Sequence, residues 1–368
     1  MAINLPTSKS INTGKLGRIF DDMSESYKLF WFKSIVDFVF EGKTVLSFDE
    51  IVNNMIAEAW YMVSEYKLNL GPSDIIEKCI LMIFDGSRLK SSEKKETIVK
   101  YLENNNDRDF CRIKNKLTRY VPKRFQSPFM DDVNEKERNS NNIIEIINSH
   151  SNLLYYFDNN KKDVIRITDD FADYIKKNYE IVLGWVRYKM IIYLQKRNPS
   201  VPGIGYKLDP PTTRQLNIVT KYWKEVSKET RVFDIYTGID LNKAKISIDH
   251  FVPWSYVAHD ELWNLIPTTR SINSSKSNYL PVWEEYFPKL CRLQYNAYEV
   301  SRVNSRIEKT FNDCLDKHVN DQKIRFMLYD HKQSETEFFN KMEEIIKPVY
   351  NAAKELGFSE WKVKQTTL

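Results

Sequence analysis

A break near the middle of the chain constrains the fold more than any other feature. Residues 198–211, NPSVPGIGYKLDPP, hold four prolines and two glycines within 14 residues. Proline lacks a backbone N–H and its ring clashes with the preceding helical turn, so no regular helix runs through this stretch. We therefore expect a linker here, followed by a new helix capped by Thr212 or Thr213.

The chain before this break is expected to be mostly helical. Tyr27, Trp31, Ile35 and Phe38 recur at spacings of three and four residues, which makes one apolar stripe on a helix that Ser24 could cap. Residues 169–197 form a longer helical pattern, with a break or bend expected near Gly184. Such aromatic stripes are typical of a hydrophobic core.

The pattern of apolar residues changes after residue 230. Short strand-like runs lie on either side of Thr237-Gly238 and Asn242-Lys243, and helical patterns return after about residue 285. The expected fold class is α+β, mostly α-helical, with a small embedded β-containing segment. We expect four regions: a helical domain at 1–200, a linker and helix at 201–230, the embedded domain at 231–285, and a helical region at 286–368.

Composition excludes some classes of protein. The sequence has no run of 18 apolar residues, so we expect no membrane span, and its polar start lacks the apolar centre of a signal peptide. The four cysteines are scattered with no C-x-x-C pair, which argues against disulfides and a thiolate zinc site. These features favour the cytoplasm.

The net charge of +5 is modest, but basic residues cluster locally. The run RIKNKLTRYVPKR, residues 112–124, contains six basic residues, no acidic residue and one tyrosine. Such a run could contact nucleic-acid phosphates while the ring stacks on a base, or it could be an ordinary solvated helix face. The candidate phosphate contacts are Arg112, Lys114, Lys116, Arg119, Lys123 and Arg124.

The segment KAKISIDHFVPWS carries the clearest chemical signal. Ile246 and Ile248 alternate with polar residues as in a half-buried strand, which ends in Asp249 and His250. A short helix that Thr268 or Thr269 could cap then carries Asn273, Lys276 and Ser277 on one face. If this face packs against the strand end, Asp249, His250 and Asn273 come together.

These groups suit hydrolysis of a phosphodiester. A neutral imidazole, here His250, can take a proton from attacking water. The Asp249 carboxylate and the Asn273 amide oxygen make a sparse, oxygen-only site that Mg²⁺ (or Mn²⁺) prefers when it keeps its waters and takes a substrate oxygen. No zinc is expected.

At these residues the chain resembles the ββα-metal finger of the HNH endonuclease superfamily, and most closely the HNH domain of RNA-guided CRISPR effector nucleases. That subgroup also reads Asp-His-x-Val-Pro-x-Ser, then Asn, then Asn-x-x-Lys-Ser, at these intervals. The resemblance implies that Asp249 and Asn273 are metal ligands and that His250 is the general base. It also implies that Asn264 ties the loop to the strand and that Lys276 approaches the phosphate.

The expected function is therefore a metal-dependent HNH endonuclease that cuts DNA, with RNA as the alternative substrate. Other standalone bacterial HNH proteins suggest, by analogy, defence against phage or mobile DNA. A non-catalytic nucleic-acid-binding adaptor with a degenerate finger is the alternative from another class. Arg270 and Lys245 are further candidate contacts to nucleic acid, and a partner protein or a homo-oligomer is compatible with the sequence.

Overall fold

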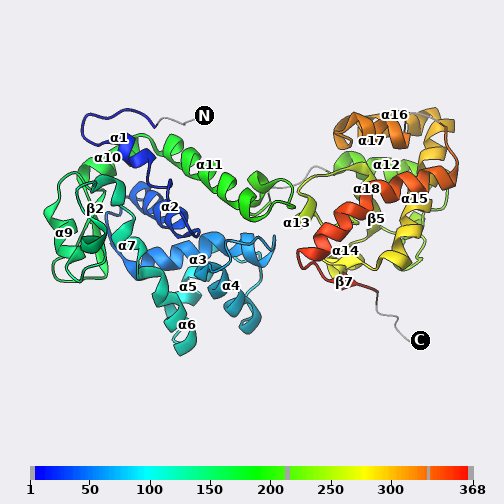
Figure 1. Cartoon of the computed structure of the whole chain (residues 1–368). Coiled ribbons are helices and arrows are strands. Elements are labelled where there is room, and N and C mark those ends of the chain that lie inside the picture. Colours follow the sequence, from blue (N-terminus) through cyan, green and yellow to red (C-terminus); the bar gives the residue numbers. More distant parts are fainter. Residues whose placement is uncertain (1–4, 212–215, 330–331, 364–368) are drawn as a thin grey trace. The chain divides into compact units, whose positions relative to one another are not determined.

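The computed structural model describes residues 5–211, 216–329 and 332–363, which form two compact units (Figure 1). Unit 1 comprises Met1–Pro199 with Leu208–Pro210, and unit 2 comprises Ser200–Lys207 with Pro211–Leu368. The expected fold class, a mostly helical α+β protein, is confirmed. The expected caps Thr212 and Thr213 lie outside the described residues.

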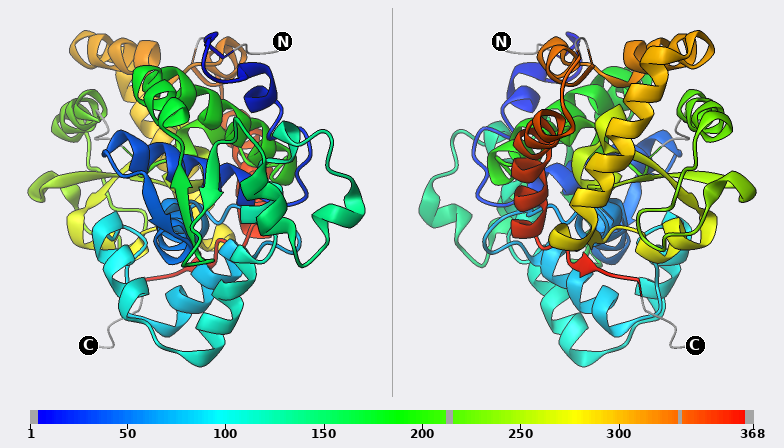
Figure 2. Two further views of the ribbon diagram at one scale, coloured as in Figure 1. Left: turned by 90° about the vertical axis from the view of Figure 1, so that its left-hand side faces the viewer. Right: turned by 90° about the vertical axis from the view of Figure 1, so that its right-hand side faces the viewer.

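Unit 1 is helical around one small sheet that the sequence patterns did not predict. Its three short strands are antiparallel in the order β1-β3-β2 (Figure 2). Its elements are α1 (Thr13–Gly17), α2 (Tyr27–Phe40), β1 (Val45–Ser47), α3 (Phe48–Ser64), α4 (Ile75–Gly86), α5 (Lys95–Asn104), α6 (Arg108–Lys114), η1 (Asn115–Thr118), α7 (Val121–Arg124), η2 (Ser127–Phe129), α8 (Glu135–Arg138), α9 (Ile143–Ser149), β2 (Tyr155–Phe157), β3 (Val164–Ile167), α10 (Asp169–Lys177) and α11 (Tyr179–Arg197).

Two local expectations in unit 1 were wrong. Helix α2 has Ser26 as its N-cap residue, not Ser24, and the Ser26 hydroxyl donates to buried Asp74 over 2.6 Å. The long helical pattern breaks at Asn178, between α10 and α11, whereas Gly184 lies inside α11. A single glycine is tolerated inside a helix at a modest cost when the flanking residues pack.

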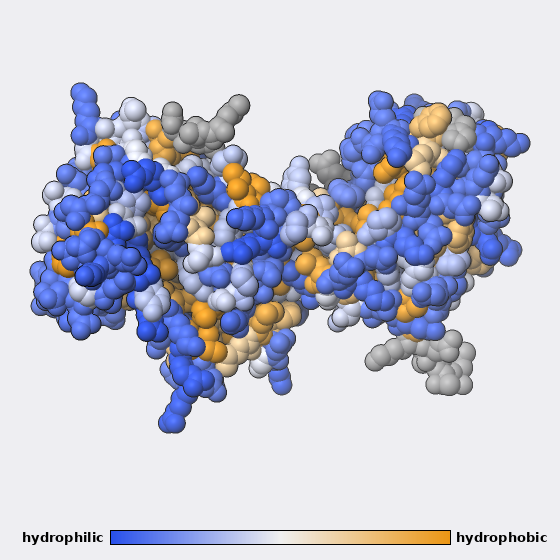
Figure 3. Space-filling view, in the orientation of Figure 1, coloured by the Kyte–Doolittle hydropathy of each residue, from blue (hydrophilic) through white to orange (hydrophobic). Residues whose placement is uncertain are grey.

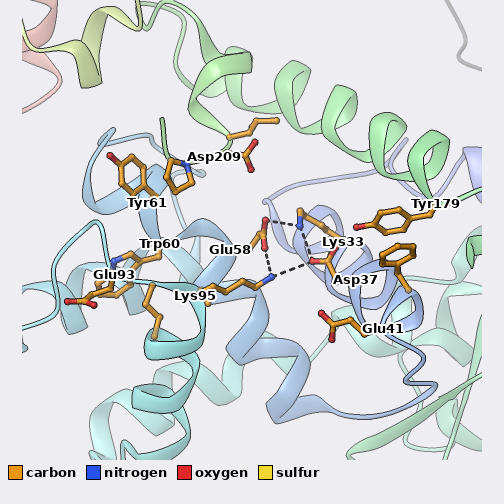
Figure 4. Close-up of a pocket in the computed structure, with 15 residues that line it drawn as sticks. Lys33, Asp37, Glu41, Glu58, Trp60, Tyr61, Glu93, Lys95, Tyr179 and Asp209 are labelled. Atoms are coloured by element: carbon orange, nitrogen blue, oxygen red, sulfur yellow. Dashed lines mark hydrogen bonds and ion pairs between the residues drawn. The ribbon is translucent and has the colours of Figure 1, made fainter. Parts of the chain in front are cut away.

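Four charged side chains link α2, α3 and α5 at the wall of a cavity of about 380 Å³ (Figure 4). Lys33 lies 2.9 Å from Asp37 and 2.7 Å from Glu58, and Lys95 lies 2.7 Å from the other Glu58 oxygen. Burial raises the pKa of Glu58, but the two lysines outweigh burial and leave that pKa below its ordinary value. The network is therefore internally neutralised and joins three helices.

Replacing Glu58 with Gln should destabilise the protein, because Lys33 would keep a buried charge with one carboxylate fewer. We expect the free energy of unfolding to fall by about 3 kcal/mol at neutral pH, measured by chemical denaturation. A depressed carboxyl pKa stabilises the fold above the unfolded value of about 4.5, and this contribution is lost as the pH falls through the folded value. The wild type and the variant should therefore converge in acid.

Glu41→Gln is the matched control, because Glu41 lines the same cavity and has no ion-pair partner among the described residues. If Glu58→Gln and Glu41→Gln had equal unfolding free energies, the network would contribute nothing to stability.

Unit 2 has one hydrophobic core that is shared by the expected embedded domain and the helices after it. Phe251 contacts the rings of Trp283, Phe287 and Tyr350, and α15 packs beside α18 (Figure 2). Its elements are η3 (Ile204–Lys207), α12 (Asn217–Glu229), η4 (Leu241–Lys243), β4 (Ile246–His250), α13 (Trp254–Val257), η5 (Leu262–Asn264), β5 (Leu265–Thr269), α14 (Arg270–Lys276), β6 (Leu280–Pro281), α15 (Trp283–Val303), α16 (Ser305–His318), α17 (Gln322–Tyr329), α18 (Glu335–Glu355) and β7 (Glu360–Trp361).

Two details of unit 2 differ from the sequence expectations. The run before Thr237-Gly238 forms only an isolated bridge, Phe233 to Asp240, around a turn in which Gly238 has a φ of +74°. The proline-rich linker contains the 3₁₀-helix η3, and its Lys207 is fully buried with its ammonium bonded to the carbonyls of Ser255 and Tyr256. Part of the linker is thus packed into unit 2.

Hydrophilic residues predominate on the face drawn in Figure 3. None of the helices in the described ranges has both the length and the apolar character needed to cross a membrane.

Candidate active site

Three elements of unit 2 build the candidate site. Strands β4 and β5 pair antiparallel, with Asp249 opposite Ile266 and His250 opposite Leu265. Helix α14 follows β5 directly, and the Thr269 hydroxyl caps it by accepting from the Ile272 N–H. A direct strand-to-helix connection fixes the helix against the strand pair, so the arrangement is strand, strand, helix.

The Asp249 carboxylate is buried and held on two sides. The Tyr236 hydroxyl donates to Oδ2 over 2.8 Å, and the Lys276 ammonium lies 3.2 Å from Oδ2 and 3.3 Å from Oδ1. Burial, and then the Asp249 charge, raise the pKa of Tyr236 well above its ordinary value, so the hydroxyl keeps its proton as a donor. These contacts fix the direction of the carboxylate.

Asn273 is anchored through its amide nitrogen. Nδ2 donates to the Ile248 carbonyl over 2.8 Å and to the Ser247 hydroxyl over 3.1 Å. Because both donor bonds use the nitrogen, the amide oxygen is the atom left to act as a ligand. Asn273, Asp249 and His250 line the same hollow, which has a volume of about 420 Å³. The juxtaposition expected from the sequence is therefore present.

His250 has a carboxylate partner that the sequence reasoning missed. Its Nε2 lies 2.7 Å from Oδ1 of Asp260, a residue in the loop between α13 and η5. The backbone carbonyl of Asp260 in turn accepts from Nδ1 of His318, on α16. A carboxylate on one ring nitrogen sets the tautomer and orientation of an imidazole. Nothing in the spacing of His250 and Asp260 suggested this contact.

Asn264 joins the loop to the end of the strand. Its side chain accepts from the Val252 N–H over 2.7 Å and donates to the Val252 carbonyl over 2.9 Å. Its own backbone carbonyl accepts from the Phe251 N–H. All three residues are fully buried, so these bonds satisfy backbone groups that water cannot reach.

The structure corrects the expectation that Lys276 approaches a substrate phosphate, because Lys276 does not line the hollow. Its side chain is fully buried, and its ammonium donates to the His250 carbonyl over 2.7 Å as well as contacting Asp249. Burial lowers the pKa of this ammonium, and the Asp249 charge opposes that shift. Lys276 therefore holds the Asp249 carboxylate and the end of β4 in place from the interior of unit 2. By contrast, Arg270 is exposed and lines the hollow, and Lys245 is exposed outside its lining.

The basic run 112–124 lies in unit 1 and does not form a continuous surface. Arg112 pairs with Asp109, and Lys114 is buried and pairs with Asp49. The expectation that Lys114 contacts phosphates is corrected for this reason. Lys116 is exposed. The remaining members, Arg119, Lys123 and Arg124, line a separate hollow.

The donor set fits a sparsely held divalent cation. Among the described residues there is no group of three or more His, Cys, Asp or Glu side chains that could bind a metal. One carboxylate and one amide oxygen at a single hollow would leave most coordination positions to water and substrate, as Mg²⁺ favours. Asp249 and Asn273 could hold such an ion, and the contact of Lys276 with Asp249 would reduce the negative charge offered to it.

The strand pair followed by a helix, with Asp-His at the end of the first strand and Asn on the helix, is the arrangement that the resemblance to a ββα-metal finger implied. Residues 234–282 match the family model of the HNH endonuclease, which confirms the HNH resemblance for this part of the chain and indicates nuclease activity. HNH nucleases generally use divalent metal ions and act on nucleic acids. Searches of curated proteins and of solved structures found no significant match.

Removing the Asn264 side chain should loosen the loop beside His250. Asn264→Ala leaves a buried N–H and a buried C=O of Val252 unpaired, at a cost of about 1–3 kcal/mol each. We expect a lower free energy of unfolding and faster amide exchange at Val252, measured by denaturation and by hydrogen exchange.

Asn264→Asp is the isosteric variant, which keeps an oxygen that can accept from the Val252 N–H but replaces the amide donor by a carboxylate in a fully buried site. Because a buried carboxylate without a positive partner is costly, the free energy of unfolding at neutral pH should fall at least as far as in Asn264→Ala and should partly recover in acid, where the protonated carboxyl can donate. Wild-type exchange at Val252 in Asn264→Ala would contradict this account of the loop.

Proposed function

We propose that this chain is a divalent-metal-dependent endonuclease that hydrolyses phosphodiester bonds in DNA. The observation that carries the proposal is the convergence of His250, Asp249 and Asn273 on one hollow within the stretch that matches HNH endonucleases. The hollow is polar at its walls and includes an exposed arginine, Arg270, which suits an anionic substrate.

His250 is the proposed general base. In its neutral form the imidazole takes a proton from the attacking water, a contribution worth about 10²–10⁴ in rate. The Asp260 carboxylate at Nε2 holds the ring in one orientation and stabilises the imidazolium that forms. This is the division of roles between a histidine base and a carboxylate that orients it, as in other hydrolases.

Asp249 and Asn273 are the proposed ligands of Mg²⁺ or Mn²⁺. When bound, such an ion supplies positive charge to the phosphate and to the leaving oxygen. Tyr236 and Lys276 fix the Asp249 carboxylate, and Ser247 and the Ile248 carbonyl fix the Asn273 amide. Both ligands are therefore oriented before any ion arrives. Arg270 is positioned to contact a substrate phosphate.

Cleavage of supercoiled plasmid with Mg²⁺, with Mn²⁺ and with EDTA tests the proposal. We expect nicking or linearisation with a divalent ion, none with EDTA, and a loss of at least about 100-fold in His250→Ala. His150→Ala is the control, because His150 lies in unit 1 and contacts Asp132. Equal cleavage by wild type and His250→Ala would refute the proposal, and cleavage of RNA but not DNA would reassign the substrate.

The Asp260 contact gives a second expected outcome. Asp260→Asn keeps the size of the side chain but removes the charge beside the imidazole, so kcat should fall by about 10–100-fold, as for carboxylates that orient histidines in metal sites. KM should change little, because Asp260 does not line the hollow that holds the ligands. Asp260→Glu should recover part of the loss.

If Asp260→Asn instead changed KM and left kcat intact, Asp260 would act on substrate binding and not on the base.

We further propose that the chain acts in the cytoplasm and serves in defence against phage or mobile DNA. This part is supported by the likeness of residues 234–282 to HNH endonucleases together with the scattered free cysteines. Phage plating on cells that carry the wild-type chain or His250→Ala tests it. Equal plating efficiency on both would reject the defensive role and leave the nuclease proposal standing.

A further inference from the structure

A second hollow, in unit 1, gathers positive charge. It has a volume of about 420 Å³ and lies among α7, the two residues that precede it, the end of α8, the loop that follows α8, and the start of α9. Its lining contains no carboxylate, and its four cationic side chains are Arg119, Lys123, Arg124 and Arg138. A hollow of this composition attracts an anion.

The guanidinium groups are held in place before any ligand binds. Tyr120, which is half exposed, contacts both Arg119 and Arg124, whose guanidinium carbons lie 5.0 Å and 4.8 Å from the ring centroid. Arg124 also donates to the Asn139 side-chain oxygen, and Arg138 donates to the Met130 carbonyl over 3.0 Å. Fixed arginine forks lose little rotamer entropy when they bind a phosphate, because less remains to be ordered.

None of these four cations forms an ion pair within the part of the chain that the structure describes. No carboxylate oxygen among the described residues lies within ion-pair distance of the four cations, whereas Arg112 and Lys114, earlier in the same segment, are paired with Asp109 and Asp49. In addition, Nε of Arg138 is buried and has no hydrogen-bond partner. Arg124 and Arg138 also line an adjoining hollow whose walls contain Asp22, Glu25 and Glu135, so the carboxylate-free cluster is confined to the side that Arg119 and Lys123 line.

We propose that this hollow binds a compact phosphate-rich group: the polyphosphate of a free nucleotide or the terminal phosphate of a nucleic-acid strand. Arginine matches phosphate oxygens with paired N–H donors, and three arginines around one hollow suit closely spaced phosphates. A site that bound a nucleic-acid strand along its length would need positive charges spaced along the backbone of that strand. Here the pairing of Arg112 with Asp109 and of Lys114 with Asp49 interrupts such a series. The proposal does not depend on the nuclease function of unit 2.

Calorimetric binding to the full chain carrying His250→Ala, in EDTA, tests the inference without cleavage of the probes. The probes are ATP, inorganic tripolyphosphate, and one short single-stranded oligonucleotide with and without a 5′-phosphate. Arg119→Gln with Arg124→Gln should weaken binding by about 100-fold, since each charged hydrogen-bonding group contributes about tenfold. Arg112→Gln with Lys116→Gln is the charge-matched control outside the hollow and should change affinity by less than about threefold at moderate salt.

The probes separate the two sources of phosphate. Tight binding of ATP and tripolyphosphate identifies a free nucleotide, whereas a preference for the 5′-phosphorylated oligonucleotide identifies a strand end. Tyr120→Phe should retain affinity and Tyr120→Leu should lose it, because the ring positions both arginines. The inference is overturned if no probe binds, or if the control pair weakens binding as much as Arg119→Gln with Arg124→Gln. Plasmid cleavage plays no part in these outcomes, so the nuclease proposal fails or stands separately.

Discussion

The buried ammonium of Lys276 is the contact on which the candidate active site depends. It lies between the carboxylate of Asp249 and the carbonyl of His250, so one side chain on α14 fixes both functional residues at the end of β4. A buried carboxylate with no positive partner would be costly. The same pairing lowers the net negative charge that Asp249 presents. A site with only two protein ligands would therefore hold a cation less strongly. If the proposed ion binds there, its affinity and the stability of the strand end are coupled through Lys276.

Around this contact, unit 2 is organised to keep a small strand pair rigid. The pair β4–β5 has only five residues per strand, and such a pair is not stable alone in water. The helices α12, α15, α16 and α18 supply the missing hydrophobic core, which includes Phe251 directly after His250. The His318 contact to the Asp260 backbone extends this support to the partner of the imidazole. The candidate active site thus depends on helices that lie largely outside the stretch matching the HNH family.

The motif and its scaffold could be predicted from the sequence because their signals are local. Alternation up to Asp249, the threonine before α14 and the interval to Asn273 define a strand and a capped helix that must meet if they pack. Asp260 could not be found this way, since its contact with His250 depends on the path of an irregular loop. Lys276 was placed on the correct helix, but its depth is set by packing against β4. The sequence does not predict the sheet of unit 1, because strands of three and four residues are too short to show an alternation of apolar and polar residues. The basic run shows the same limit. Its sequence does not indicate that Lys114 forms an ion pair with Asp49, or that Arg124 has no carboxylate partner among the described residues.

The parallel pairing of β6 with β7 has a consequence for synthesis of the protein. After α14, the backbone N–H groups of Leu280 and Val282 donate to the carbonyls of Ser359 and Trp361. During translation, this edge of unit 2 stays open until residues 359–361 have left the ribosome. The order in which the chain is made therefore delays completion of unit 2 until long after β4, β5 and α14 have been synthesised.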